Sequence, residues 1–417
     1  MEVEKKIWLA LEDYFVQPFV YLFFTFNSQA ASYDLPLRVV LWNGRHIDLG
    51  KFDKPKITMH IKNWHGLWLL IRPNLNAIGE AYINKEIEID GELEDIVEVG
   101  FKLVAQVNPT ESAFERYTRM INHSRIFDRS SIQHHYDVSN AFYRLFLDET
   151  MVYSCAYFEN GDETLDEAQL KKIDHILRKV QVKPGERLLD IGCGWGTAVI
   201  RAAQKFGAYC VGVTISQAQY DLATQRVKDA GLEDRVEIRM QDYRDIDEKF
   251  DRIISVGMFE HLGQKHIVDY FAKVKTLLTD EGMFLNHGLN ARSDQGFSGG
   301  TDFIQRHVFP GSYLPTLSEA VQFAEDGGFE ILDIENLRKH YTQTMIMWAR
   351  NYEKNSEEIR RMVGESIYRC WRMYLGGSVQ SFVSNNVHIT QLLLHKSGKH
   401  PDTMPSNRRY MYAEQQS

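Results

Sequence analysis

The chain has 417 residues, which suggests two or three domains, and 44% of them are hydrophobic, enough to build a sizeable core. A formal net charge of −9 and a pI of about 5.9 argue against general nucleic-acid binding. The four cysteines form no C-x-x-C pair, so neither a zinc site nor a disulfide framework is indicated. We therefore expect no metal, and a reducing cytoplasm is the default compartment.

Residues 1–108 are predicted to form a small N-terminal α+β domain. The first residues do not resemble a signal peptide, and the longest apolar run, Tyr14 to Phe26, is too short to span a bilayer. That run is either domain core or a surface that touches lipid. Because no titratable cluster accompanies these elements, a docking module is favoured over a catalytic one. The expected strands are 38–42, 46–49, 56–61, 67–71 and 83–89, and a helix is expected over 92–105.

Residues 109–150 are predicted to be a helical connector and cofactor lid. The stretch from Arg116 to Arg129 is basic, which indicates either a solvated face or a surface that docks onto lipid phosphates. At the other end of the chain, residues 397–417 carry Gly, Pro, Ser and Asn. We expect them to form a flexible tail.

Residues 151–396 carry the pattern of an α/β domain with a mostly parallel sheet. Helical stretches separate most of the first five strands, as parallel pairing requires. Ligands of such sheets bind outside the carboxyl ends of the strands, so the residues that follow each strand are the candidates for function. The expected strands are 187–191, 209–213, 235–240, 251–256, 283–287, 330–334 and 388–394.

A glycine-rich turn, Gly192-Cys193-Gly194-Trp195-Gly196, follows the first of these strands and precedes a helix over 197–206. Glycines let a ligand approach the backbone, and a helix N-terminus offers unpaired N–H groups. The G-x-G-x-G spacing after Asp190 resembles motif I of class I methyltransferases, which bind S-adenosylmethionine. The alternative is a tight turn in some other α/β protein.

The next two strand ends supply polar groups that suit a nucleoside. Thr214 follows the second strand, and no acid for the ribose hydroxyls stands at the strand tip, where most methyltransferases place one; Gln219 is a weaker substitute. The third is followed by Asp242 and Tyr243, an acceptor for an adenine amino group beside an aromatic face; an ordinary turn is the alternative.

The fourth and fifth strands end near Glu260 and His287. A carboxylate and a histidine at neighbouring strand ends are a better candidate than either residue alone, because the fold brings both to one crevice. Upstream, Cys155 has no evident activating partner, so a thiolate nucleophile is not supported.

Six motifs together resemble the cyclopropane fatty acid synthases and the related mycolic acid methyltransferases. They are Y-S-C-A-Y-F, L-L-D-I-G-C-G-W-G, G-V-T-I-S-x-x-Q, Q-D-Y-R-D, F-E-H-L-G and K-H-Y-T-Q-T, and they extend over about residues 130 to 395. The resemblance implies a class I S-adenosylmethionine-dependent methyltransferase fold, with a Rossmann-like seven-stranded sheet. The N-terminal region looks like the lipid-docking domain of longer bacterial members.

The resemblance also implies two ligand sites. The cofactor would be held by Tyr153, Ser154, Leu188, Asp190, Gly192, Gly194, Gly196, Thr214, Gln219, Asp242 and Tyr243. Family members also bind a bicarbonate ion, whose ligands correspond to Cys155, Glu260, His287, the backbone of Leu289, and Tyr341. A C-terminal cysteine once proposed as catalytic in the family aligns with Ser378, which argues against a required thiol there.

The activity implied is cyclopropanation of unsaturated phospholipid acyl chains at a membrane, with bicarbonate as general base. Methyl transfer to an alkene leaves a carbocation that aromatic faces stabilise, and Tyr341, Phe303 and Tyr313 are the candidates. Alternatives are an acyl-chain methyltransferase that gives a methyl or methylene branch, methylation of a small polar acceptor, and a non-enzymatic lipid-binding protein. The expected location is the cytoplasm, peripherally on the inner face of the membrane. Longer family members are often dimers, so a homodimer is also expected.

Overall fold

The computed structural model describes residues 34–63, 66, 75–107, 139–292, 312–399 and 404–412. The chain divides into two compact units. The N-terminal unit comprises Met1–Tyr117, Ser298–Phe303 and Gly364–Gln380; the large unit comprises Thr118–Phe297, Ile304–Val363 and Ser381–Ser417. Several predictions lie outside the described residues: the apolar run 14–26, the strand 67–71, the basic stretch 116–129 and Phe303.

The N-terminal unit is built on a four-stranded sheet with the strand order β2-β1-β3-β4. β1 pairs parallel with β3, and the other pairs are antiparallel. Alternate residues point to the core, so Leu37 and Val39 of β1 are buried beside Ile57 and Met59 of β3. The elements are β1 (Leu37–Val40), β2 (His46–Asp48), β3 (Ile57–Ile61), α3 (Leu75–Ile83), β4 (Ile87–Asp90) and α4 (Leu93–Val107).

A helix from late in the sequence, α16 (Glu365–Val383), contributes most of its length to this unit. Its Arg369 donates to the carbonyl oxygen of Tyr82 at 2.9 Å and to a Glu88 carboxylate oxygen at 2.7 Å. Gly376 lies so close to Val97 of α4 that a Cβ atom would stand 2.5 Å from its Cγ2. The division therefore differs from the predicted one, in which residues 151–396 formed a single catalytic domain.

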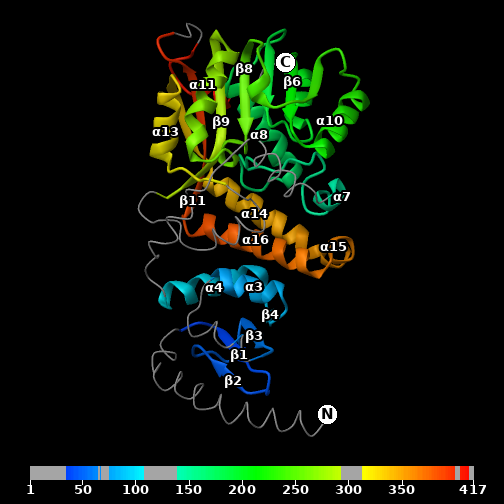
Figure 1. Cartoon of the computed structure of the whole chain (residues 1–417), viewed down its shortest axis with the longest axis vertical. Helices are drawn as coiled ribbons and strands as arrows, with labels where there is room; N and C mark the ends of the chain where they lie inside the picture. Colours follow the sequence, from blue (N-terminus) through cyan, green and yellow to red (C-terminus); the bar gives the residue numbers. More distant parts are fainter. Residues whose placement is uncertain are drawn as a thin grey trace. The chain divides into compact units, whose positions relative to one another are not determined.

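The large unit contains a seven-stranded sheet with the order β10-β11-β9-β8-β5-β6-β7, in which only β11 is antiparallel to its neighbours (Figure 1). This confirms the predicted class I methyltransferase sheet. The strands are β5 (Arg187–Ile191), β6 (Tyr209–Thr214), β7 (Val236–Met240), β8 (Phe250–Val256), β9 (Leu278–Ala291), β10 (Phe329–Asn336) and β11 (Val387–Lys396).

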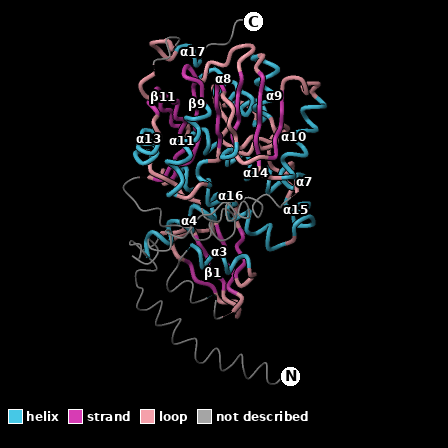
Figure 2. Tube along the Cα trace, turned by 45° about the horizontal axis from the view of Figure 1, so that its top comes forward, coloured by secondary structure: helices cyan, strands magenta, loops and turns pink. Residues whose placement is uncertain are grey.

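Helices cover both faces of this sheet, as in other doubly wound folds, and Figure 2 shows the strands enclosed by them. On one face, Leu189 and Ile253 pack with residues of α11 and α13. On the other, Leu188 and Ile254 pack with residues of α8, α9 and α10. The helices are α7 (Asn140–Tyr143), α8 (Leu165–Lys179), α9 (Thr197–Phe206), α10 (Gln217–Asp229), α11 (Ile267–Leu277), α13 (Leu317–Asp326), α14 (Arg338–Lys354), α15 (Ser356–Val363) and α17 (Arg409–Tyr412).

The segment 404–412 differs from the flexible tail that we predicted. Met411 is buried in the core cluster beneath α8, and His175 forms a hydrogen bond at 3.3 Å between its Nδ1 and the Met411 carbonyl oxygen. The Tyr412 ring stacks on His175, with ring centroids 5.6 Å apart. Two anchoring side chains therefore order a segment whose composition is otherwise that of a loop.

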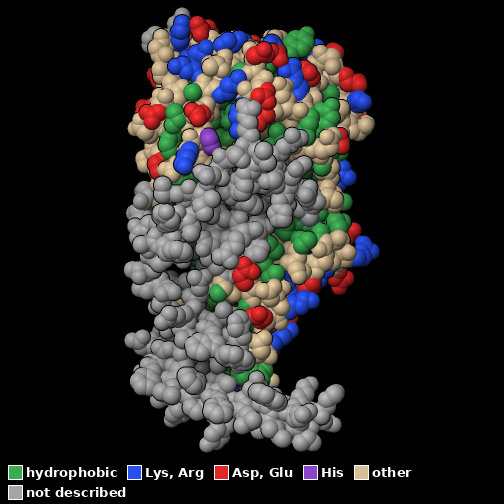
Figure 3. Space-filling model, viewed as in Figure 1, with side chains coloured by type: hydrophobic (Ala, Val, Ile, Leu, Met, Phe, Trp, Pro, Cys, Tyr) green, Lys and Arg blue, Asp and Glu red, His purple; other side chains and the backbone are tan. Residues whose placement is uncertain are grey.

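None of the described helices is both long enough and apolar enough to cross a bilayer. On the visible face of the large unit, acidic and basic side chains are interspersed (Figure 3).

Candidate functional site

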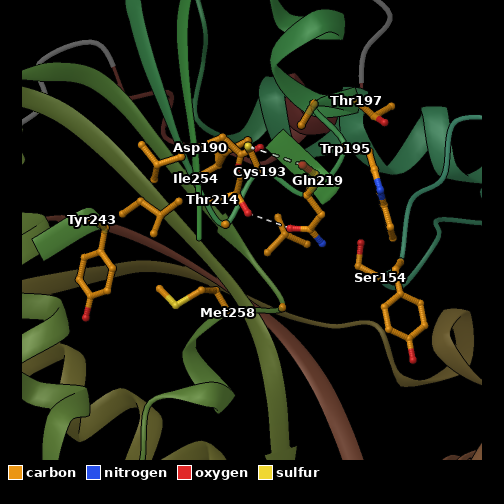
Figure 4. Close-up of a pocket in the computed structure, with 18 of the residues that line it drawn as sticks. Ser154, Asp190, Cys193, Trp195, Thr197, Thr214, Gln219, Tyr243, Ile254 and Met258 are labelled. Atoms are coloured by element: carbon orange, nitrogen blue, oxygen red, sulfur yellow. Dashed lines mark hydrogen bonds between the residues drawn. The ribbon is translucent and has the colours of Figure 1, made fainter. Parts of the chain in front are cut away.

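A pocket opens at the carboxyl ends of β5 and β6, where the sequence predicted the cofactor (Figure 4). The segment Met151–Ser154 borders it on one side, and the turn after β7 borders it on another. In Figure 4 Ser154 and Tyr243 stand on opposite sides of the view. The predicted cofactor residues that line the pocket are Tyr153, Ser154, Asp190, Gly192, Gly194, Thr214, Gln219, Asp242 and Tyr243.

The glycine turn has the backbone geometry that its sequence predicts. Gly192, Gly194 and Gly196 all have positive φ, at 81°, 54° and 81°, which L-residues with side chains rarely adopt. A Cβ atom on Gly192 would also lie 3.2 Å from the Met258 side chain. The turn delivers the chain to the N-terminus of α9, whose free N–H groups lie at the pocket.

Thr214 and Gln219, which the sequence predicted to hold the ribose, both line the pocket. The Thr214 hydroxyl donates to Gln219 Oε1 at 2.8 Å, which fixes the amide orientation and leaves the Gln219 Nε2 group for the pocket. Because an amide nitrogen donates, it would bind a ribose oxygen as acceptor, whereas a carboxylate would accept from the hydroxyl.

Asp242 is engaged by a neighbour that the sequence analysis did not consider. Arg244 donates to Asp242 Oδ1 from its backbone N–H and from Nε, each at 2.9 Å, and to Oδ2 from Nη2 at 2.6 Å. Arg244 therefore fixes the orientation of the Asp242 carboxylate at the edge of the pocket. Arg244 also lines the pocket.

Two predicted cofactor residues do not line the pocket. Leu188 is fully buried in the core cluster of α8 and α9, because it lies three residues before the end of β5. Gly196 is the N-cap of α9 and faces Ala223, whose Cβ is 3.2 Å from the position of an added Cβ. Leu188 and Gly196 therefore contact the interior of the large unit and not the pocket.

The sequence analysis missed Lys172, which lines the pocket although only 3% of its surface is exposed. It lies on the buried face of α8, and its Nζ donates to the Ser154 hydroxyl at 2.9 Å. A signal was present in the sequence: Lys172 stands in the apolar stripe that continues with Ile173 and Ile176.

Contacts connect four of the five residues predicted to bind bicarbonate, whereas the fifth, His287, is related to them only by its place on β9. Cys155 lies in a small hydrophobic cluster with Leu337 and Ile389, and Leu289 and Tyr341 pack against that cluster. The Leu289 backbone hydrogen-bonds the Glu260 carboxylate. His287 lies two residues before Leu289 on β9.

Glu260 is buried, and burial raises the pKa of its carboxyl to about 7, although hydrogen bonds from backbone groups partly oppose this. Its Oε2 has no hydrogen-bond partner among the described residues. A Cβ atom on Gly288 would stand 3.3 Å from Oε2 and 2.2 Å from the Phe259 ring. The absence of a side chain at Gly288 therefore leaves room for the Glu260 and Phe259 side chains.

His287 is also buried, and burial, assisted by the positive charge of Lys172, holds the pKa of its imidazole well below the usual range. The ring is therefore neutral at physiological pH. Gln391 on β11 lies 3.1 Å from Nδ1, while Nε2 has no partner within the described part of the chain.

Cys155 is fully buried, and burial raises the pKa of its thiol. The thiol donates to the Ala156 carbonyl oxygen at 3.2 Å. A protonated, enclosed thiol is not a nucleophile, which agrees with the sequence analysis. Ser378 lies on α16, in the N-terminal unit.

An aromatic row connects the two sites. Tyr153 of the pocket lies 5.1 Å from the buried Trp348 ring, which meets the Tyr341 ring edge-on at 6.0 Å. Tyr313, another predicted aromatic candidate, donates its backbone N–H to the Glu260 carbonyl oxygen at 3.0 Å, and its hydroxyl to Glu319 at 3.0 Å. Aromatic faces are thus present near Glu260 and next to the pocket.

Within residues 34–63, 75–107, 139–292, 312–399 and 404–412, no three His, Cys, Asp or Glu side chains gather in a way that would hold a metal ion.

The family model of mycolic acid cyclopropane synthetases matches residues 123–392. The chain belongs to this family. The membership confirms the resemblance and the predicted enzyme class, an S-adenosylmethionine-dependent methyltransferase. A second model, of a domain of unknown function, matches residues 27–108.

Two curated relatives and one solved structure illustrate the similarity. A probable fatty acid methyltransferase of Pseudomonas putida is 38% identical over 91% of this chain and 97% of its own length. Cyclopropane mycolic acid synthase 3 of Mycobacterium tuberculosis is 35% identical over 64% of this chain and 96% of its own. The structure of the mycolic acid cyclopropane synthase CmaA1, complexed with SAH and CTAB, superposes with a TM-score of 0.62 at 33% identity, covering 64% of this chain and 98% of that one.

Proposed function

We propose that this family member transfers a methylene unit from S-adenosylmethionine to the cis double bond of an unsaturated phospholipid acyl chain, forming a cyclopropane ring with bound bicarbonate as general base. The main support for this proposal comes from the side chains of Glu260 and His287. Each presents a buried polar atom, Oε2 and Nε2 respectively, with no partner among the described residues. Buried polar atoms are ordinarily hydrogen-bonded, so an unpaired acceptor after β8 and an unpaired ring nitrogen on the adjacent strand β9 favour a small polar ligand.

The donor set suits bicarbonate in particular. Bicarbonate has one O–H group and further oxygens that accept hydrogen bonds, so its site needs both a hydrogen-bond acceptor and donors. Such a site does not require metal ligands. Glu260, when ionised, would accept the O–H, and the Nε2–H of neutral His287 would donate. Tyr341 and the Cys155 thiol stand in the same hydrophobic cluster beside Leu289, which keeps bulk water away from these groups.

The pocket residues likewise suit S-adenosylmethionine. Asp242 and Tyr243 would hold the adenine ring, Thr214 and Gln219 the ribose, and Ser154 with the glycine turn the methionyl end. When bound, S-adenosylmethionine supplies an electrophilic methyl group and bicarbonate supplies a base for one of that group's protons. The CmaA1 complex with SAH supports the same use of this pocket.

The chain's own residues bind the two reactants, orient them toward each other and exclude water from the site. An isolated alkene is a weak nucleophile, so the reaction depends on close approach of the two reactants. The Tyr153–Trp348–Tyr341 row offers aromatic faces to positive charge that develops on the acyl chain. Proton removal would then depend on the Glu260 carboxylate, which would hold bicarbonate by its O–H.

The phospholipid substrate also implies contact with a membrane surface. We propose that the protein acts as a peripheral protein on the cytoplasmic face, and as a homodimer in solution. Vesicle co-sedimentation and light scattering would test these two points independently of catalysis.

The second candidate is a methyltransferase that leaves a methyl or methylene branch on the acyl chain. The 38% identity to the probable fatty acid methyltransferase, over nearly the whole of both chains, favours it. Both reactions need the same cofactor pocket. Cyclopropane and methylene-branched products differ in how the last proton is lost, and a saturated methyl branch would need a separate reductant in addition.

One experiment separates these readings. The full-length protein is incubated with methyl-labelled S-adenosylmethionine and vesicles of cis-monounsaturated phospholipid, and the lipids are analysed by mass spectrometry. A labelled lipid heavier by CH2 that no longer reacts as an alkene is the expected result. A labelled lipid that is heavier by CH2 but still reacts as an alkene supports a methylene branch. Absence of label in lipid would refute both.

A further inference from the structure

A buried lysine without a carboxylate partner stands in the wall of the cofactor pocket. Lys172 makes no ion pair within 4.0 Å in the part of the chain that the structure describes, and its hydrogen bond to the Ser154 hydroxyl at 2.9 Å connects it to the pocket. Its neighbour Lys171 is the opposite case, since it is partly exposed and pairs with Glu163 at 2.7 Å. Two adjacent lysines of α8 therefore occupy contrasting environments.

The buried position of Lys172 is energetically unfavourable for a charged group. Burial lowers the pKa of its ammonium to about 8, against the opposing influence of Cys155, Asp148 and Asp190. At neutral pH the side chain is still mostly charged. Burial of an ammonium without a carboxylate in contact does not stabilise a fold, so such groups concentrate at functional sites.

A second buried side chain of α8 holds the same segment. Gln169, one helical turn before Lys172, donates from Nε2 to the carbonyl oxygens of Val152 and Ser154, at 3.2 and 2.8 Å. Ser154 is thus held at its carbonyl by Gln169 and at its hydroxyl by Lys172. Asp148 completes the attachment by accepting the Val152 N–H at 2.8 Å.

The hydrogen bond from Lys172 fixes what the Ser154 hydroxyl can do. A hydroxyl that accepts from an ammonium keeps its own hydrogen for another acceptor, and Ser154 lines the pocket. If Asp242 and Tyr243 hold the adenine ring, Ser154, on the other side of the view in Figure 4, meets the methionyl end. The strong hydrogen-bond acceptor at that end is a carboxylate.

We propose that Lys172 is a positioning residue that acts through Ser154: it orients and polarises the Ser154 hydroxyl as a donor to the carboxylate of S-adenosylmethionine. The inference rests on the proposed use of this pocket for S-adenosylmethionine. The ammonium also supplies positive charge near the buried Asp190 carboxyl, whose pKa burial raises to about 7 and Lys172 lowers. Lys172 itself is not a catalytic residue, because its contact is with Ser154.

The test compares two ligands that differ only in the carboxylate. Binding of S-adenosylmethionine and of decarboxylated S-adenosylmethionine to the full-length protein is measured by calorimetry for wild type, Lys172→Met and Lys171→Met. We expect Lys172→Met to weaken S-adenosylmethionine binding about tenfold to a hundredfold, as for loss of a charge-assisted hydrogen bond, and to change binding of the decarboxylated ligand by less than about threefold. Lys171→Met should leave both affinities unchanged.

A purely structural role would weaken both ligands equally, and that result, like unchanged binding, would overturn the proposal. Ser154→Ala provides a second test with Lys172 intact, and it should also weaken binding of S-adenosylmethionine but not of the decarboxylated ligand. Circular dichroism shows whether Lys172→Met folds. If it does not fold, Ser154→Ala decides whether the proposal stands. If wild type binds neither ligand, the proposed function itself fails. The two failures are therefore distinguishable.

Discussion

Gln391 on β11 places its Nε2 3.1 Å from Nδ1 of His287 on the adjacent strand β9, in direct register across the sheet. With the amide nitrogen as donor, Nδ1 is the acceptor, so the proton of the neutral ring is on Nε2. That is the atom without a partner among the described residues. Gln391 therefore prepares His287 as a donor toward the proposed bicarbonate.

Replacing Gln391 by Leu should disturb this tautomer. Without the amide donor, the imidazole proton moves freely between its two nitrogens, and Nε2 loses its donor role part of the time. We expect kcat to fall about tenfold or more with little change in S-adenosylhomocysteine affinity, as for loss of one buried hydrogen bond. Steady-state kinetics and calorimetry measure the two quantities.

Thr390→Val is the matched control, because Thr390 is also buried on β11 but hydrogen-bonds Asn290 at 2.5 Å. It should leave kcat near the wild-type value. Equal losses in the two variants would mean that general damage to β11, and not the His287 tautomer, lowers the rate.

The raised pKa of Glu260 predicts a pH profile. If the ionised carboxylate accepts the bicarbonate O–H, kcat/KM should rise with pH and level off above about 7, the pKa that burial gives this carboxyl. Glu260→Gln should lose at least tenfold in kcat and also lose this rise, while still binding S-adenosylhomocysteine. Normal turnover by Glu260→Gln with normal cofactor binding would contradict the assignment.

The same pKa predicts a stability difference of known sign. A carboxyl with a pKa near 7 in the folded chain, against an ordinary 4.5, binds a proton more tightly when folded. Its stabilising contribution is complete below pH 4.5 and is lost as pH rises through about 7, on the order of 3 kcal/mol at most. Thermal unfolding should therefore show Glu260→Gln gaining stability relative to wild type between pH 5 and pH 8. The exposed Glu330→Gln serves as the control, and a constant difference across this range would count against the shift.

The placement of Glu260 shortly after β8, and of His287 on β9 opposite the last residue of β8, could be predicted, because the ends of neighbouring parallel strands share an edge of the sheet. Gln391 could not, since its contact with His287 depends on the register of β11, 104 positions along the chain. The contact of Lys172 with Ser154 could not be predicted either, because a lysine in the apolar stripe of a helix does not indicate which residue it will contact.

Segments whose structure depends on distant contacts were predicted least well. Residues 404–412 have a loop-like composition, and the burial of Met411 and the stacking of Tyr412 on His175 order them. The assignment of α16 to the N-terminal unit rests on Arg369 and Gly376, whose partners are more than 270 residues earlier. Periodicity along the chain carries no information about such pairings.

Two adjacent glycines of α16 test the packing of that helix. Gly376→Ala would bring a methyl group 2.5 Å from the Val97 side chain and 2.8 Å from that of Leu93, both buried. Overpacking should outweigh the gain in helix propensity and lower stability by about 1 kcal/mol. A methyl group on Gly377 would have no heavy atom of the described residues within 4 Å, and Gly377→Ala should raise stability by about 0.5–1 kcal/mol. Chemical denaturation of both variants measures the difference, and the same sign for both would refute this packing.

The C-terminal segment provides a test of whether the ordered tail is part of the core. Met411 is 1% exposed and packs beneath α8, so Met411→Ala should destabilise the large unit by about 2 kcal/mol, as for loss of a buried side chain. Arg409, two residues earlier on the same short helix, is exposed, and Arg409→Ala should change stability by less than about 0.5 kcal/mol. The midpoint of urea unfolding reports both changes. Because the His175–Met411 hydrogen bond and the Tyr412 stack depend on the same docking, hydrogen exchange of α8 should also become faster in Met411→Ala. If neither the midpoint nor the exchange of α8 changes, residues 404–412 contribute nothing to the stability of the large unit.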